Sequence, residues 1–310
     1  MNEYKPEGLL IRSARNYEYI SSIEGLERAL ERQVILEAPV VLCDHNFDLH
    51  VELSGGVRGL IPRCEVEYSP DGEPVKDIAI LTRVGKTVCF KVCGFKCTPE
   101  GTVAILSRRA AQRECMENYL KTLVPGDIIP AKVTHLESFG AFVDIGCGRI
   151  SLLSIDCISV SRISHPSSRL CVGEIIYTVV RSIDERGRIF VSGRELLGTW
   201  EENAALFKEG QTVRGIVRSV ESYGIFIELT PNLAGLAEYR EDVHSGQTAA
   251  VYIKSIIPEK MKIKLIIIDT DDSPAAPTPL TYFIDPERRR HIDYWKYSPR
   301  LSSRIIETVF

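Results

Sequence analysis

The sequence predicts a mainly β protein made of three small five-stranded barrels in series, joined by short helices and followed by a C-terminal β-hairpin. The first observation is an internal repeat, because residues 133–145 align without a gap with residues 217–229. The second is the alternation of apolar residues, with glycine at short spacing, around each copy, which is typical of antiparallel strands in a small barrel. The third is a fainter copy of the same pattern over residues 47–109.

Short helices and a linker separate these barrels. A capping-box pattern over residues 21–24 predicts a helix at the front of the chain. Helix formers over 108–123 and 200–207 predict connecting helices, and Pro, Ser and Asp over 271–279 indicate a linker. The expected parts are a helical extension (1–33), a first barrel (34–110), a linker helix (111–123), a second barrel (124–197), a linker helix (198–209), a third barrel (210–270), a linker (271–279) and a C-terminal hairpin or tail (280–310).

Each strong copy of the repeat carries two aromatic rings three residues apart. These are Phe139 and Phe142 in one copy and Tyr223 and Phe226 in the other. Side chains three apart on a regular strand point to opposite faces, so we expect the glycine after the first ring to allow a bend or bulge that brings both rings to one surface. A single such ring is more often a core residue. Its repetition as a pair favours the stacking of two unpaired bases, each contributing about 1 to 3 kcal/mol.

The balance of charge excludes some partners. The chain of 310 residues has a formal net charge of −4, whereas Lys and Arg normally supply most non-specific affinity for nucleic acid by neutralising phosphates. Duplex DNA is therefore disfavoured. Stacking of unpaired bases on rings needs much less basic charge, so an acidic single-strand binder is physically reasonable.

Composition indicates a soluble, cytoplasmic protein without a cofactor. No apolar run is long enough to span a bilayer, and no secretory signal is visible. The nine cysteines are scattered, which fits a reducing compartment, and Cys89, Cys93 and Cys97 lack the C-x-x-C pair of a metal site. Residues 85–87 lack the earlier glycine of a phosphate loop. We expect no enzyme activity, no metal, no small-molecule substrate and no membrane partner.

With these residues in view, the chain resembles the S1-domain RNA-binding family, whose type member is bacterial ribosomal protein S1. The resemblance covers about residues 22–270 and implies five-stranded OB-type barrels. It also implies an RNA face of two aromatics, a His, an Asp and an Arg. In the second barrel these positions carry Phe139, Phe142, Ser154, Asp184 and Arg188, so only the His is missing.

The same family positions are less complete in the third barrel. They carry Tyr223, Phe226, Glu238, Pro258 and Lys262, so two rings and a cation remain. Glu238 would repel phosphate if it faced the RNA. The resemblance therefore implies that the third barrel is an auxiliary RNA site.

The first barrel is the most degenerate of the three. It offers Phe47 and His50, followed by Pro62, with no clear basic residue at the Arg position. By analogy with the family, we expect this barrel to dock on a partner. The implied function is binding of single-stranded RNA, including mRNA, with the small ribosomal subunit as a further partner. The alternative is a protein-interaction adaptor, or an accessory factor in RNA decay or transcription, built from the same barrels.

Three other segments are left with two interpretations each. Residues 281–284 and 291–297 are expected to pair as a hairpin whose basic turn, residues 288–290, either lies beside a barrel that the hairpin packs on or contacts RNA. His165 is either part of a surface turn or an RNA contact. Arg108 and Arg109 either begin a solvated helix or touch phosphate.

Overall fold

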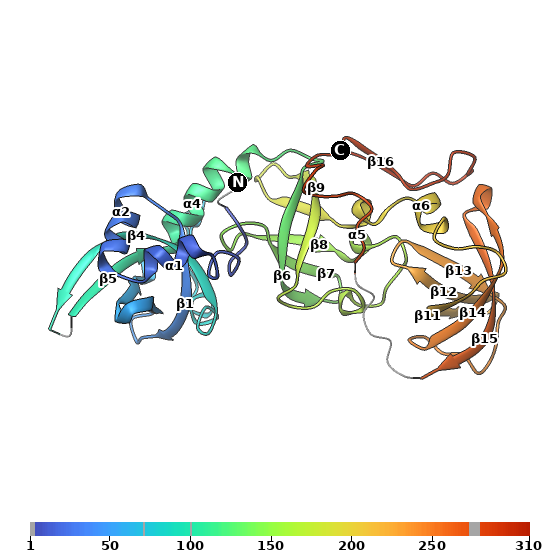
Figure 1. The fold of residues 1–310 in the computed structure, drawn as a ribbon, viewed down its shortest axis with the longest axis horizontal. Helices are drawn as coiled ribbons and strands as arrows, with labels where there is room; N and C mark the ends of the chain where they lie inside the picture. The colour runs from blue at the N-terminus through green and yellow to red at the C-terminus, as the bar shows by residue number, and fades with distance from the viewer. Residues whose placement is uncertain (1–3, 71, 100, 273–279) are drawn as a thin grey trace. The chain divides into compact units, whose positions relative to one another are not determined.

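The structure, a computed structural model, describes residues 4–70, 72–99, 101–272 and 280–310 (Figure 1). Most of the linker expected over 271–279 therefore lies outside the described residues. The chain divides into two units, of which the first comprises residues 1–123 with 144–150 and the second comprises 124–143 with 151–310. The expected mainly β architecture is confirmed, because three closed five-stranded barrels account for most of the strands.

The first unit contains one barrel, whose strands close in the order β1-β2-β3-β5-β4. Leu36 and Phe90 point inward and are buried. Ser22 begins the helix before the barrel, where its side chain accepts a hydrogen bond from the backbone N–H of Gly25. The elements are α1 (Ala14–Ile20), α2 (Ile23–Arg32), β1 (Leu36–Cys43), β2 (Leu49–Glu52), β3 (Arg58–Ile61), α3 (Asp77–Leu81), β4 (Thr87–Thr98), β5 (Gly101–Ser107) and α4 (Arg108–Asn118).

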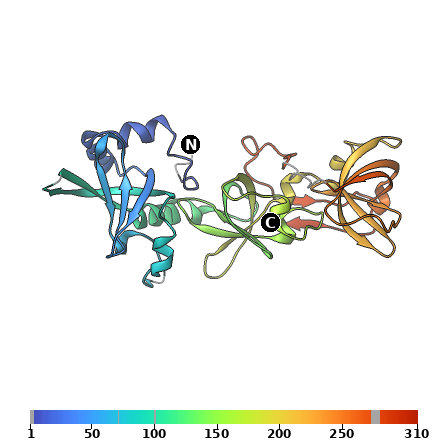
Figure 2. The same ribbon diagram turned by 90° about the horizontal axis from the view of Figure 1, so that it is seen from below.

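The second unit contains the other two barrels (Figure 2). Their strands close in the orders β10-β8-β7-β6-β9 and β11-β12-β13-β15-β14. The elements of the second barrel are β6 (Ile128–Glu137), β7 (Gly140–Asp144), β8 (Ile150–Ser154), α5 (Ile155–Ile158), β9 (Ile175–Ile183) and β10 (Ile189–Ser192). Those that follow are α6 (Trp200–Ala204), β11 (Thr212–Glu221), β12 (Gly224–Thr230), β13 (Leu233–Ala237), β14 (Thr248–Ile257), β15 (Lys262–Asp271), β16 (Tyr294–Lys296) and β17 (Glu307–Val309).

One hydrogen bond recurs in all three barrels. A glycine just before the fourth strand donates its backbone N–H to a valine carbonyl in the first strand, and each glycine has a positive φ that favours glycine. The pairs are Gly85 with Val40 at 2.9 Å, Gly173 with Val133 at 2.8 Å and Gly246 with Val217 at 2.8 Å. Residues at equal distances from these pairs therefore occupy equivalent places in the three barrels.

The C-terminal hairpin forms between partners that differ from those expected. Strand β16 pairs with β17, so the predicted pairing of residues 281–284 with 291–297 is wrong. The backbone N–H of Phe283 donates to the carbonyl of Leu196, and that of Ile292 donates to the carbonyl of Gly126, each at 2.9 Å. These N–H groups donate to carbonyls of the second barrel and are therefore not available for pairing across a hairpin. The segment over residues 281–292 therefore packs on the second barrel, which is one of the two interpretations offered by the sequence.

Arg108 is buried, which contradicts both interpretations offered for it. Its side chain is 0% exposed at the start of α4, and its Nε donates to Glu7 Oε1 at 2.7 Å. Burial alone would lower the pKa of Arg108, but the Glu7 carboxylate raises it. The pattern around residue 108 gives no sign of an acid reaching it from the start of the chain. Arg109 is half exposed and lies 3.9 Å from Glu65.

Within the described ranges, no helix combines the length and the apolar character needed to cross a bilayer.

Candidate RNA interface

The two rings of the second barrel share one surface. Phe139 lies in the tight turn between β6 and β7, and Phe142 lies on β7. Their centroids are 6.0 Å apart with the planes at 87°, an edge-to-face pair, and Phe139 is 52% exposed. The rings meet because the first is in the turn and not on the strand.

Gly140 is confined by the neighbouring strand. It has no left-handed φ, and a Cβ built on it would lie 2.5 Å from the backbone oxygen of Leu153. Gly224 of the third barrel is equally confined, because its Cβ would lie 2.6 Å from the backbone oxygen of Ala237. The glycine is therefore required by the close approach of the neighbouring strand, which fixes the turn that carries the first ring.

The third barrel repeats this geometry. The Tyr223 and Phe226 centroids are 6.1 Å apart with the planes at 85°, and Tyr223 is 68% exposed. Tyr223 follows the end of β11 in the turn, and Phe226 lies on β12. The sequence repeat thus produces two edge-to-face ring pairs, each with its outer ring largely in solvent.

An outward row of side chains extends from the second ring across the third barrel. Phe226 pairs with Leu236 on β13, and Leu236 pairs with Lys264 on β15. We call Phe226, Leu236 and Lys264 the outer row. Lys262 and Lys264 are exposed and alternate with buried Ile263 and Leu265, so both lysines face outward. Lys264 lies in line with the ring, and the family positions did not reveal it.

The second barrel has an equivalent outer row with a ring in place of the lysine. Leu152 of β8 pairs with Phe190 of β10, as Leu236 pairs with Lys264. Phe190 is half-buried and lies two residues after Arg188. A third ring therefore stands on this surface. The apolar alternation of β10 hinted at it, but its place in the row of Phe142 follows from its pairing with Leu152, which occupies the position of Leu236 in the gap-free repeat.

His135 is a further residue that was missed. Its ring stacks on Phe142 with centroids 6.5 Å apart and planes at 22°, and its Nε2 lies 2.8 Å from Glu137 Oε1. His135 is exposed on β6. Ser154 stands where the family has a His, but His135 places another imidazole beside Phe142.

Asp184 organises the turn that presents Arg188. Its carboxylate accepts from the backbone N–H groups of Arg186 at 3.0 Å and Arg188 at 2.8 Å, and from Arg188 Nε at 2.6 Å. These bonds, first that from the Arg188 backbone, lower the pKa of Asp184. The Arg188 side chain is 66% exposed. Arg188 is thus paired with Asp184 and still presents most of its side chain to solvent.

The remaining family positions lie at strand ends. Ser154 closes β8, and a hydrogen bond from its side chain lowers the pKa of Asp156. Glu238 is exposed just after β13, and Lys262 begins β15. Pro258 begins a 3₁₀ turn, so the third barrel has no carboxylate at the place of Asp184.

In the first barrel, groups of the same unit contact both residues at the ring positions. The Arg63 guanidinium lies 4.9 Å from the Phe47 ring centroid, and it also bonds to Asp77 at 2.5 Å. His50 Nε2 lies 3.3 Å from Asp44 Oδ2. The one ring is therefore capped on one face by a cation, and this surface differs from the exposed ring pairs of the other barrels.

The other two segments are local features. His165 caps a 3₁₀ turn, its Nδ1 accepting from the backbone N–H of Ser167 at 3.2 Å. Arg288, Arg289 and Arg290 are exposed, and Arg288 lies 3.3 Å from Asp285.

The sequence is similar to proteins that contain S1 domains. Residues 123–194, which contain the second barrel, match the S1 RNA binding domain. The small ribosomal subunit protein bS1 of Staphylococcus aureus (strain COL) is 29% identical over 283 residues, covering 86% of this chain and 69% of that protein. The bS1 protein of Staphylococcus haemolyticus (strain JCSC1435) is 29% identical over 284 residues, with the same coverage. The resemblance to S1-domain RNA-binding proteins is therefore confirmed.

Solved structures add little to this comparison. GSP13 from Bacillus subtilis is 28% identical, covers 24% of this chain and 57% of that chain, and has a TM-score of 0.23. A TM-score this low supports no conclusion about the arrangement of the barrels.

Proposed function

We propose that this chain binds single-stranded RNA along the outward surfaces of its second and third barrels. The observation that carries the proposal is the edge-to-face ring pair at the same turn of both barrels, with Phe139 52% and Tyr223 68% exposed. Exposure of aromatic rings to water is unfavourable, and the same exposure makes the rings available for stacking with unpaired bases. A cation, Arg188 or Lys264, lies on the same surface of each barrel.

The second barrel supports the stronger site. It carries Phe142 with Phe139 and His135 beside it, and Phe190 in the same outer row. Stacking on rings is tolerant of base identity, and each stacked base contributes about 1 to 3 kcal/mol. The third barrel replaces the outer ring of the row with Lys264 and adds Lys262, so its contribution depends more on phosphate contacts.

A buried contact inside the second unit supports joint binding by its two barrels. Arg169, in the loop before β9, bonds to Glu228 of β12, and the two side chains are 0% and 1% exposed. Arg218 Nε donates to the same carboxylate at 2.7 Å. An RNA held by the ring pair of one barrel would therefore meet the ring pair of the other barrel at high effective concentration.

The finer proposal is a role in translation on mRNA at the small ribosomal subunit. It rests on the similarity over most of the chain to proteins named as small ribosomal subunit protein bS1. The test is fluorescence anisotropy with a labelled single-stranded RNA. The Phe139→Ala, Phe142→Ala double variant is expected to bind at least about 30-fold more weakly, from two stacked bases at about 1 kcal/mol each.

A matched control separates stacking from general loss of aromatic surface. Tyr17, on α1, is 63% exposed and lies outside the barrel surfaces, so Tyr17→Ala should leave RNA affinity unchanged. If the double variant folds and still binds RNA like the unmodified protein, the stacking proposal is wrong.

A second candidate function, that of a protein-interaction adaptor, is favoured by the first barrel. Its ring is capped by Arg63, and Val41, Leu42, Ile78 and Leu81 are exposed in the same unit. The two functions separate in sedimentation with small ribosomal subunits after ribonuclease has trimmed the mRNA. Full retention on the subunits supports the adaptor, whereas release with the trimmed RNA supports the RNA binder.

A further inference from the structure

In the first barrel, a segment of this chain covers the outward surface of the first and fourth strands. We call this surface the flank face of a barrel. Glu37 on β1 and Cys89 on β4 are paired there and are 0% and 1% exposed. The Glu37 carboxylate accepts hydrogen bonds from the backbone N–H groups of residues 8, 10 and 11, at 3.0, 2.9 and 2.9 Å. The N-terminal segment therefore seals this face.

The flank face of the second barrel is covered by the C-terminal segment. Ile128 on β6 and Val179 on β9 point outward, yet they are only 8% and 0% exposed because Ile292 packs into the same cluster. The Tyr282 ring meets Tyr177 edge to face at 5.9 Å, and its hydroxyl accepts from the Tyr177 backbone N–H at 2.9 Å. An extended segment with aromatic and aliphatic side chains is thus the natural cover of this surface.

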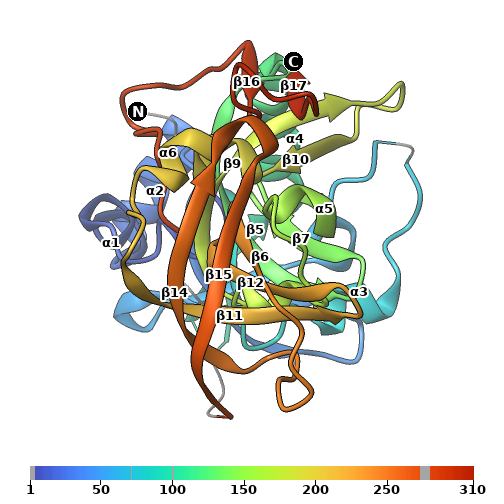
Figure 3. The ribbon, with the colours of Figure 1, turned by 90° about the vertical axis from the view of Figure 1, so that its right-hand side faces the viewer.

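The flank face of the third barrel has no such cover among the described residues. Tyr252 follows Gly246 by the same number of positions as Val179 follows Gly173, so the two are equivalent. Tyr252 is nevertheless 38% exposed. Figure 3 looks onto β14 and β15, and no described helix or strand lies in front of them. Among the residues that the structure describes, a segment of the chain covers this face in the first two barrels and none covers it in the third.

The fifth strand enlarges the open surface. In the first two barrels this strand ends at Ser107 and Ser192, which are buried and lead into helical turns. In the third barrel the strand continues, and Ile266, which pairs with Tyr252, is 47% exposed. Ile268 is 55% exposed. Tyr252, Ile266 and Ile268 together form an apolar strip.

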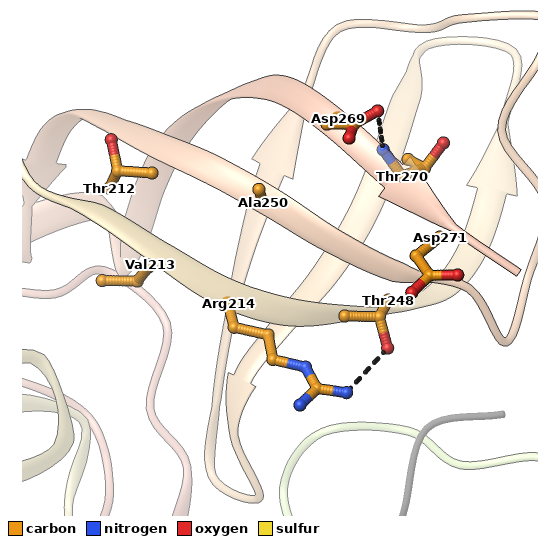
Figure 4. A pocket seen from close by; sticks show the side chains of 8 residues that line it. All are labelled: Thr212, Val213, Arg214, Thr248, Ala250, Asp269, Thr270 and Asp271. Carbon is orange, nitrogen blue, oxygen red and sulfur yellow. Dashed lines mark hydrogen bonds between the residues drawn. The ribbon is translucent and has the colours of Figure 1, made fainter. Parts of the chain in front are cut away.

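A hollow of about 400 Å³ lies on the same strands (Figure 4). Thr212, Ala250 and Asp269 are among its lining residues, and Arg214 donates to Thr248 Oγ1 at 3.2 Å on one side. Thr212 and Ala250 belong to the first and fourth strands, so the hollow is part of the flank face. It offers room for a side chain next to the apolar strip.

Charge decides which class of partner fits. Asp269 and Asp271 line the hollow at the far end of β15 from Lys262 and Lys264. Arg214 is the one cation among the lining residues of the hollow, so the two aspartates leave its rim acidic. An acidic rim repels RNA phosphates and attracts Arg and Lys. The segment over residues 281–292, which covers the second barrel, combines aromatic and aliphatic side chains with the arginines at 288–290. A partner of the same chemistry would complement both the strip and the rim.

We infer that the flank face of the third barrel is a docking site for an extended segment of a partner protein, with aromatic or aliphatic side chains next to basic ones. The inference goes beyond the proposed RNA binding and does not depend on it, because the strip and the hollow use the part of β15 that begins at Ile266 and runs to Asp271, beyond Lys262 and Lys264. It assigns separate surfaces of one barrel to RNA and to protein.

The probe is a labelled synthetic peptide with the sequence of residues 280–297, titrated into the full chain and followed by fluorescence anisotropy. Saturable binding is expected. The Ile266→Ser, Ile268→Ser double variant should bind at least about tenfold more weakly, because hydrophobic anchors dominate such contacts. Asp269→Lys should weaken binding most at low salt. Val172→Ser, which changes an exposed apolar side chain of the second barrel, is the matched control and should bind normally.

Affinity for single-stranded RNA is measured on the same variants. The inference expects it to be unchanged in the Ile266→Ser, Ile268→Ser variant, whose fold is checked by thermal denaturation. Absence of saturable peptide binding overturns the inference, as does peptide binding that survives in this variant. Loss of RNA binding in place of peptide binding also overturns it, because the face would then belong to the RNA interface.

Discussion

Removal of the charge on Glu7 should selectively destabilise the first unit. Arg108 is 0% exposed, and its Nε and Nη2 donate to the Glu7 carboxylate at 2.7 and 3.2 Å. The change Glu7→Gln leaves a fully buried guanidinium without its counter-charge. Breaking a buried pair in this way costs about 3 to 5 kcal/mol.

The tryptophans provide an assay that separates the two units. Trp200 and Trp295 both lie in the second unit and are buried, so their fluorescence follows the unfolding of that unit alone. Far-ultraviolet circular dichroism follows the strands of both units. In urea, Glu7→Gln should move the dichroism transition of the first unit to lower denaturant concentration and leave the fluorescence midpoint in place.

The double variant Glu7→Gln, Arg108→Met is the control for charge. It removes both members of the pair and should recover much of the lost stability, because replacement of a buried ion pair by apolar groups is often neutral. The remaining loss reflects the bond from Arg108 Nη1 to the Val66 carbonyl at 3.1 Å. Unchanged dichroism in the single variant, or an equal shift of the fluorescence midpoint, would refute this account of the pair.

Four further outcomes are expected. Gly140→Ala should lower the free energy of unfolding of the second unit by about 1 to 3 kcal/mol, seen as a lower fluorescence midpoint, because its Cβ would lie 2.5 Å from a backbone oxygen; an unshifted midpoint would show that the strands can separate. Phe190→Ala should weaken binding of single-stranded RNA about fivefold or more, for one lost stack of about 1 kcal/mol; equal affinity would remove Phe190 from the interface. Lys264→Ala should reduce the slope of log affinity against log salt by about 0.7, and an unchanged slope would mean that Lys264 meets no phosphate. Asp127, with a smaller contribution from Asp293, raises the pKa of His291, so the stabilisation is present below about pH 6.5 and lost as the pH rises through the raised value; the fluorescence midpoint should fall from pH 6 to pH 8, and Asp127→Asn should reduce that fall.

Local patterns predicted the ring pairs because the rings are close in sequence. Phe139 and Phe142 lie on either side of one turn, and their relation depends only on the residues between them. The role of Gly140 was less predictable, since the glycine is confined by the backbone of Leu153 on the neighbouring strand. That contact is long-range, and a single stretch of sequence does not contain it.

The missed residues depend on strand register. Phe190 joins the outer row because it pairs with Leu152, and Lys264 joins it because it pairs with Leu236. A shift of one residue would turn either side chain to the other face. The sequence alternation shows that these positions point outward but not which ring they lie beside.

The failed predictions share a further physical cause. Arg108 and the backbone of Phe283 find partners that are far away in sequence, at Glu7 and Leu196. Helix and strand propensities describe neighbours along the chain, so they gave a solvated helix start and a local hairpin. Burial of a charge or docking of a segment is decided by tertiary contacts.

The position of each cover along the chain has a consequence for synthesis. The N-terminal segment that seals the first flank face is made before the strands it covers, whereas the cover of the second barrel follows the whole third barrel, as the span of 164 positions between Asp127 and His291 illustrates. A nascent chain would therefore carry Ile128 and Val179 exposed while the third barrel is still being made. Once the segment has been made, it meets two uncovered flank faces, so pairing with the third barrel, or with a neighbouring chain, is the expected route to misfolding.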